Sequence, residues 1–211
     1  MLLQQPAVAI TDFLLAFETI ILGWVILNIR SKSRVRLFVF LFYISLALGS
    51  ILGGIVHGFF PEAGSFWNLI LWKSTMISIG LVALFAWLIA GDLVLSKYNK
   101  LILYLAPFEF LLYSFFIIFV SSKFNTAILN YLPAIIFLFI AFSILYFRRK
   151  NLSILLGLVG IILTFISAWI QQAQIALHPI YFNHNALYHL VQAIALLLIF
   201  FALKKIISKN I

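Results

Sequence analysis

Seven long apolar stretches, separated by short polar connections, account for most of this 211-residue chain. A transmembrane helix needs about 20 mostly apolar residues, and each of the stretches satisfies this requirement. They cover residues 9–28, 37–60, 67–93, 101–120, 127–147, 152–170 and 185–203. We therefore expect an all-α integral membrane protein, in which residues 1–211 form a single domain built as a seven-transmembrane-helix bundle.

The composition excludes an ordinary soluble domain. Hydrophobic residues make up 65% of the chain and charged residues 9%, whereas soluble domains are roughly 45–50% apolar and about 25% charged. The chain contains no cysteine, which excludes disulfides, thiolate metal sites and cysteine nucleophiles. Because no Lys or Arg precedes the first apolar stretch, we expect that stretch to be retained rather than cleaved as a signal peptide.

The basic residues predict an orientation in the membrane. The first, third and fifth connections and the C-terminal tail hold 12 of the 14 Lys and Arg residues. These are Arg30, Lys32, Arg34, Arg36, Lys97, Lys100, Arg148, Arg149, Lys150, Lys204, Lys205 and Lys209. By the positive-inside rule, this alternation predicts an N-terminus outside and a C-terminus inside, in a bacterial cytoplasmic membrane or an organelle membrane. The net charge of +9 could suggest a nucleic-acid partner. The Lys and Arg residues are instead grouped in short connections between apolar stretches, which is the pattern that orients a membrane protein, so we expect no nucleic-acid partner.

Polar side chains gather in one half of the predicted bilayer. Ionisable groups inside a membrane are costly and usually face the interior of a bundle, so each one is a candidate for function. The topology places such groups from five helices in the outer half, whereas Asp92 and Glu109 lie elsewhere and have no assigned role. The outer group consists of Asp12, Glu18, Ser50, His57, Asn68, Lys73, Gln171, His184, Asn185, His189 and Gln192. We expect a polar cavity that opens to the outer face or the outer leaflet.

Helical spacing relates some of these residues to one another. Ser50, Gly53, Gly54 and His57 fall on one face of the second helix, where the two glycines would let a helix or a ligand approach closely. Asn185 and His189 share a face of the seventh helix with Gln192, at i, i+4 and i+7.

These features resemble a known family, the alkaline ceramidase and progestin/adipoQ receptor superfamily. Its members have seven helices and include zinc-dependent hydrolases of lipid amides, which bind zinc through a His of the second helix and an HxxxH motif of the seventh. Ser50 and His57 match the second-helix part, and His189 matches the second His of HxxxH. The sequence departs from the family at the first His of that motif, where Asn185 stands and His184 lies one residue away.

Two further positions also differ from the family pattern. Gly53 stands where the family usually has its Ser, four residues before the second-helix His, and Asn68 stands where it has an Asp of the third helix.

The resemblance implies a zinc-dependent intramembrane hydrolase that cleaves an amide or ester bond of a membrane lipid. Three protein ligands and a water are typical of catalytic zinc, and we expect His57, His184 and His189 as these ligands. Zinc would polarise the lipid carbonyl while metal-bound hydroxide attacks it. We expect Ser50, Asn68, Asp12 and Glu18 to support the ligands or to transfer protons, with Lys73, Asn185, Gln192 and Gln171 in the rest of the cavity.

The same residues are also compatible with functions that need no metal. The alternative is a membrane transporter, or a lipid- or ligand-binding protein, in which the cavity is the binding site and Glu18 forms an ion pair with Lys73. In this interpretation Asp12 would cap the first helix or stabilise its first turn, and the histidines would form hydrogen bonds between helices. A third alternative is a structural subunit whose polar groups only fix helix packing.

Overall fold

Seven α-helices make up almost all of the computed structural model, which describes residues 3–95, 99–179 and 181–208. The helices are α1 (Pro6–Leu27), α2 (Arg34–Phe59), α3 (Phe66–Val94), α4 (Asn99–Phe119), α5 (Phe124–Arg149), α6 (Leu152–Gln172) and α7 (His184–Ser208). Each is long and apolar enough to cross a membrane. The prediction of an all-α protein with seven such helices is therefore confirmed.

The helices extend a few residues beyond the apolar stretches. α1 already begins at Pro6, and α7 continues through Lys204 and Lys205 to Ser208. Hydropathy locates the part of a helix that lipid would surround, whereas backbone hydrogen bonding continues into the polar residues beyond it.

Short polar side chains fix several helix starts. Ser65 Oγ accepts a hydrogen bond from the Asn68 amide at 3.4 Å. Asn183 Oδ1 accepts from the amides of Asn185 and Ala186, both at 3.1 Å. Such caps satisfy amides that have no partner inside the helix, and the second cap sets where the polar face of α7 begins.

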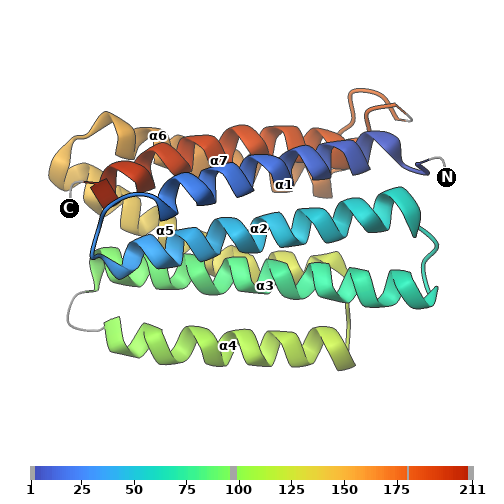
Figure 1. Ribbon diagram of the computed structural model, residues 1–211, viewed down its shortest axis with the longest axis horizontal. Coiled ribbons are helices and arrows are strands. Elements are labelled where there is room, and N and C mark those ends of the chain that lie inside the picture. The colour runs from blue at the N-terminus through green and yellow to red at the C-terminus, as the bar shows by residue number, and fades with distance from the viewer. Residues whose placement is uncertain (1–2, 96–98, 180, 209–211) are drawn as a thin grey trace.

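Six of the helices form a closed ring, and the seventh lies outside it. Around the ring, each helix packs against the next in the order α1, α2, α3, α5, α6 and α7, and α7 closes the ring against α1. α4 packs against the outer side of α3, so it lies at the edge of the bundle (Figure 1). The helices run antiparallel, so α1 begins at one end of the bundle and α7 ends at the other.

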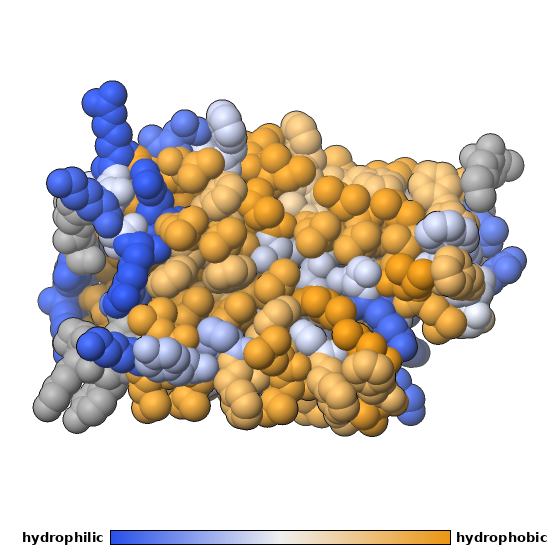
Figure 2. Space-filling model, turned by 60° about the horizontal axis from the view of Figure 1, so that its bottom comes forward, coloured by the Kyte–Doolittle hydropathy of each residue, from blue (hydrophilic) through white to orange (hydrophobic). Residues whose placement is uncertain are grey.

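The surface has a broad hydrophobic band between two hydrophilic ends (Figure 2). We call one end the basic end, because the described Lys and Arg residues of the first, third, fifth and C-terminal segments lie there. They are Arg30, Lys32, Arg34, Arg36, Lys100, Arg148, Arg149, Lys150, Lys204 and Lys205. Lys97 and Lys209 lie outside the described residues. Asp92 also lies at the basic end, where Arg34 Nε donates to its Oδ1 at 2.7 Å.

The half of the ring nearer the basic end is filled by a dry core. Ile26, Phe42, Tyr43, Ile89 and Phe142 have no exposed surface and belong to one hydrophobic cluster. The hydroxyl of Tyr43 donates to the carbonyl of Leu196 at 3.0 Å, which satisfies its polar atom. The core therefore closes the ring on this side.

The closest approach of α6 and α7 depends on glycine. A Cβ added at Gly160 would lie 2.6 Å from the carbonyl oxygen of Ala195 and 2.9 Å from Cγ1 of Ile199. Close approach at small residues is a common basis for helix association in membranes.

We expect Gly160→Ala to push α6 away from α7 and to lower the free energy of unfolding by about 1–3 kcal/mol, as overpacking typically does. The measurement is the thermal unfolding midpoint in detergent. Gly49→Ala is the matched control, since its Cβ would lie at an ordinary 3.4 Å from Cβ of Ser78. Equal midpoints for the two variants would contradict the tight packing of α6 on α7.

Candidate functional site

The ring encloses a cavity of about 220 Å³ in the half opposite the basic end. All six ring helices contribute to its lining. One wall, formed by α1, α2 and α7, is mainly polar and includes Asp12, Ser50, His57, Asn185, His189 and Gln192. The facing wall, formed by α3, α5 and α6, is mainly apolar and includes Trp72, Ile79, Phe124, Ile128 and Phe165. The cavity thus has one mainly polar wall and one mainly apolar wall.

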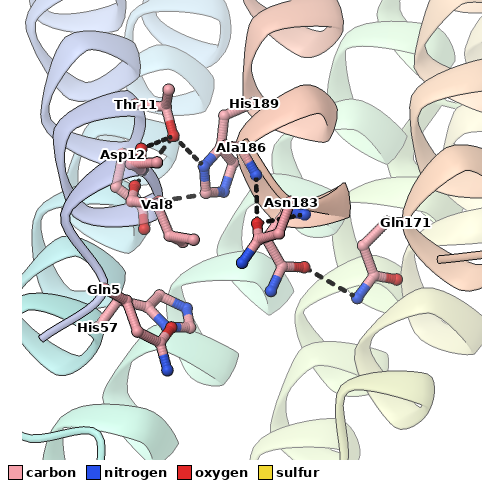
Figure 3. Close-up of polar contacts among 11 residues, drawn as sticks. Gln5, Val8, Thr11, Asp12, His57, Gln171, Asn183, Ala186 and His189 are labelled. Atoms are coloured by element: carbon pink, nitrogen blue, oxygen red, sulfur yellow. Dashed lines mark hydrogen bonds and ion pairs between the residues drawn. The ribbon is translucent and has the colours of Figure 1, made fainter. Parts of the chain in front are cut away.

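A buried pair of Asp12 and His189 joins α1 to α7 in the polar wall. His189 Nε2 lies 3.2 Å from Asp12 Oδ1, and His189 Nδ1 lies 3.0 Å from Thr11 Oγ (Figure 3). The two residues lie six and five positions after the starts of their helices, which at 1.5 Å per residue is about 8–9 Å below the end of the bundle.

The hydrogen bonds of Thr11 determine how many protons this pair holds. The Thr11 hydroxyl lies 2.9 Å from the carbonyls of both Ala7 and Val8 and donates towards them, so its oxygen accepts from His189 Nδ1–H. The contact between Nε2 and the Asp12 carboxyl then needs a second proton, on the ring or on the carboxyl. Either placement leaves the pair neutral overall, which costs less in lipid than a lone buried charge.

Asp12 keeps one free acceptor beside the cavity. Among the described residues, no hydrogen-bond partner reaches its buried Oδ2. The carboxyl lies against Gly53 of α2, where an added Cβ would be 3.3 Å from Oδ1 and 3.4 Å from Oδ2. The glycine therefore leaves the room that this carboxyl occupies.

A second polar cluster ties α6 to α7 below His189. Ser167 Oγ donates to Gln192 Oε1 at 2.8 Å, and Gln192 Nε2 donates to Thr164 Oγ at 3.3 Å. Nearer the end of the bundle opposite the basic end, Gln171 Nε2 and Asn185 Oδ1 lie 3.5 Å apart. The face that Asn185 shares with His189 and Gln192 thus lines the cavity over two turns.

Several predicted site residues lie elsewhere. Glu18, Asn68, Lys73 and His184 are absent from the cavity lining. Asn68 Nδ2 donates to the carbonyl of Phe60 at 2.7 Å, which closes the connection between α2 and α3. His184 begins α7, and its distance of five residues from His189 turns it to another face of the helix.

The predicted ion pair between Glu18 and Lys73 is wrong. Lys73 Nζ donates to the carbonyl of Ile118 at 2.7 Å. This carbonyl lies in the last turn of α4, where helix carbonyls have no partner within the helix and attract a cation. The suggested cap or first-turn role of Asp12 is also wrong, because α1 begins at Pro6 and places Asp12 in its second turn.

Comparison with known proteins identifies a family. A model described as a family of unknown function, DUF6962, matches residues 7–208. The chain belongs to the DUF6962 family. The match covers all seven helices, whereas no curated protein and no solved structure matches the chain. In this DUF6962 protein, the cavity is the feature that points to a function.

Sequence reasoning missed several polar partners in and around the cavity. Thr11 and Gln5 were not recognised, although Gln5 Oε1 lies 2.9 Å from His57 Nδ1 (Figure 3). On α6, Thr164 and Ser167 stand three residues apart, with Gln171 four further on. This i, i+3, i+7 spacing was a signal for a polar helix face in an otherwise apolar stretch.

The residues of the cavity do not fit the zinc site that the family resemblance implies. In the described part of the chain, no three His, Cys, Asp or Glu side chains lie close enough together to hold a metal ion. His184 does not reach the cavity, and both ring nitrogens of His189 face partners on α1. A catalytic zinc needs three convergent protein ligands, so no chemical step is assigned to zinc here.

We expect protein purified without chelators to contain far less than one zinc per chain, because the ligand set does not converge. The measurement is elemental analysis of the detergent-purified protein beside a His57→Ala/His189→Ala variant. Near-stoichiometric zinc in the wild type that disappears in the variant would contradict this expectation and favour the zinc hydrolase.

Proposed function

We propose that this DUF6962 protein spans a membrane with its N-terminus outside, and that its cavity binds a small amphipathic molecule drawn from the outer leaflet. The observation that carries the proposal is the two-sided cavity, which combines a polar and an apolar wall within a ring of membrane-length helices.

The distribution of charge supports the orientation. The basic end carries Lys and Arg from four separate segments, whereas the described Lys residues towards the other end are Lys73 and Lys123. The positive-inside rule then places the basic end on the cytoplasmic side. The cavity, in the opposite half, would face the outer leaflet.

The lining supports an amphipathic ligand. Binding sites for small molecules combine a mostly apolar lining with a few well-placed polar groups. Here the free Asp12 Oδ2 suits a hydroxyl or amide donor of the ligand, while Trp72, Phe124 and Phe165 would contact its hydrocarbon part. The volume suits a ligand with one short chain rather than a whole phospholipid.

The closed core favours binding over conduction. Below Gln192, the ring is filled by Tyr43, Phe42 and their fully buried neighbours, which offer no polar route to the basic end. Transport would need this core to open, whereas binding needs only the cavity as it stands.

We expect a charged, membrane-impermeant thiol reagent to modify Asn185→Cys in right-side-out vesicles, because this position lines the cavity and is only half-buried. The chain has no other cysteine, so intact-mass measurement reports this site alone. Ser78→Cys is the control, since Ser78 is buried and lies outside the cavity lining. Modification only in inside-out vesicles would contradict the orientation, and modification in neither would contradict an accessible cavity.

We expect Ala168→Phe to reduce the amphiphile that copurifies with the protein severalfold, because Ala168 lines the cavity and the larger ring would fill it. The measurement is mass spectrometry of solvent extracts, expressed per mole of protein. Ile166→Phe on the exposed side of the same helix is the matched control and should not change the amount. Equal amounts in all three proteins would sink the proposed function.

A further inference from the structure

A second hollow lies outside the ring, between α4 and α5. It has a volume of about 350 Å³ and is lined by Glu109, Leu112, Tyr113 and Phe116 of α4 and by Thr126 and Asn130 of α5. α4 packs against α3 and makes few contacts with α5. We call this hollow the α4–α5 groove, and it opens to the surrounding bilayer rather than to the cavity.

The α4–α5 groove contains an unpaired acceptor and an unpaired donor. Glu109 Oε2 and Asn130 Nδ2 are both buried, and neither has a hydrogen-bond partner among the described residues. Lys73 is hydrogen-bonded to the carbonyl of Ile118 near the end of α4, whereas Glu109 lies at the middle of that helix. Unpaired polar groups are costly in lipid, where no water replaces the missing partner. A molecule that fills the groove would therefore be expected to supply both partners.

The depth of Glu109 argues against a lipid as that molecule. Glu109 lies ten residues from either end of α4, which is about 15 Å along the helix. The hydrocarbon core of a bilayer is about 30 Å thick, so this position is near its centre. Lipid tails carry no hydrogen-bonding group at that depth, whereas another protein segment does.

The groove is complementary to itself under two-fold symmetry. Glu109 and Asn130 line the same groove, so a two-fold axis parallel to the helices that brings two grooves face to face would set Glu109 of each copy against Asn130 of the other. Each contact of a two-fold interface occurs twice in this way. An Asn side chain offers both donor and acceptor atoms, so the pair forms whether or not the Glu carboxyl carries a proton.

We propose that the α4–α5 groove is the interface of a homodimer, in which Glu109 of each copy forms a hydrogen bond with Asn130 of the other. The exposed side chains of Leu105, Leu112 and Phe116 lie on the same side of α4 as Glu109 and would be covered in part by the second copy. The dimer does not depend on the proposed ligand, because neither Glu109 nor Asn130 lines the cavity.

The absence of native cysteine allows a direct test by cross-linking in native membranes. Phe119→Cys places one thiol at the end of α4, on a position 71% exposed. A membrane-permeant bismaleimide should convert this variant largely to a covalent dimer. Ile10→Cys, 49% exposed near the same end of α1, is the control and should give little dimer, because α1 contacts neither α4 nor α5.

The polar pair is tested in the Phe119→Cys background. Glu109→Leu or Asn130→Leu should reduce the cross-linked fraction at least severalfold, whereas Glu109→Gln, which keeps an acceptor, should retain it. Thermal unfolding of each variant separates loss of the dimer from loss of the fold. The proposal is overturned if Phe119→Cys cross-links no more than Ile10→Cys, or if both Leu variants fold and cross-link like the parent.

Discussion

The structure depends first on how its long apolar segments satisfy their own backbone hydrogen bonds. In hydrocarbon, an unpaired amide or carbonyl costs several kcal/mol, so a membrane-spanning segment must satisfy its own backbone. Helices do this within a single segment, which is why seven separate apolar stretches become seven helices. The same constraint applies to side chains, because an unpaired polar side chain in hydrocarbon is also costly. Each buried polar group in this protein is therefore a candidate for a role in function or in assembly.

The six-helix ring shows how such polar groups are tolerated. Asp12 and His189 form a neutral pair across α1 and α7, and Gln192 is bonded to two α6 side chains. The first contact lies in the polar wall of the cavity and the second joins this wall to α6, while the half of the ring nearer the basic end is filled by a hydrophobic cluster. The close contact of α6 with α7 at Gly160 brings together the two helices that carry the Gln192 cluster.

Outside the ring, α4 packs mainly against a single helix, α3. It is held by α3, through Tyr113 and its hydrogen bond to the carbonyl of Met76, and through Lys73 at its far end. Its middle carries Glu109, whose Oε2 has no hydrogen-bond partner among the described residues. The protein therefore combines an inner site suited to a ligand with an outer groove suited to a second copy, on different helices.

The sequence by itself determined the number and type of helices, because hydrophobic length and the positions of Lys and Arg are local properties of the chain. It also indicated the half of the bundle in which His57, His189 and Asp12 would lie, since topology assigns each residue a depth. Only the tertiary structure decided which of these side chains meet, because depth does not give the rotation of each helix or its neighbours. That rotation pairs Asp12 with His189, turns Lys73 to the carbonyl of Ile118 and keeps His184 out of the cavity.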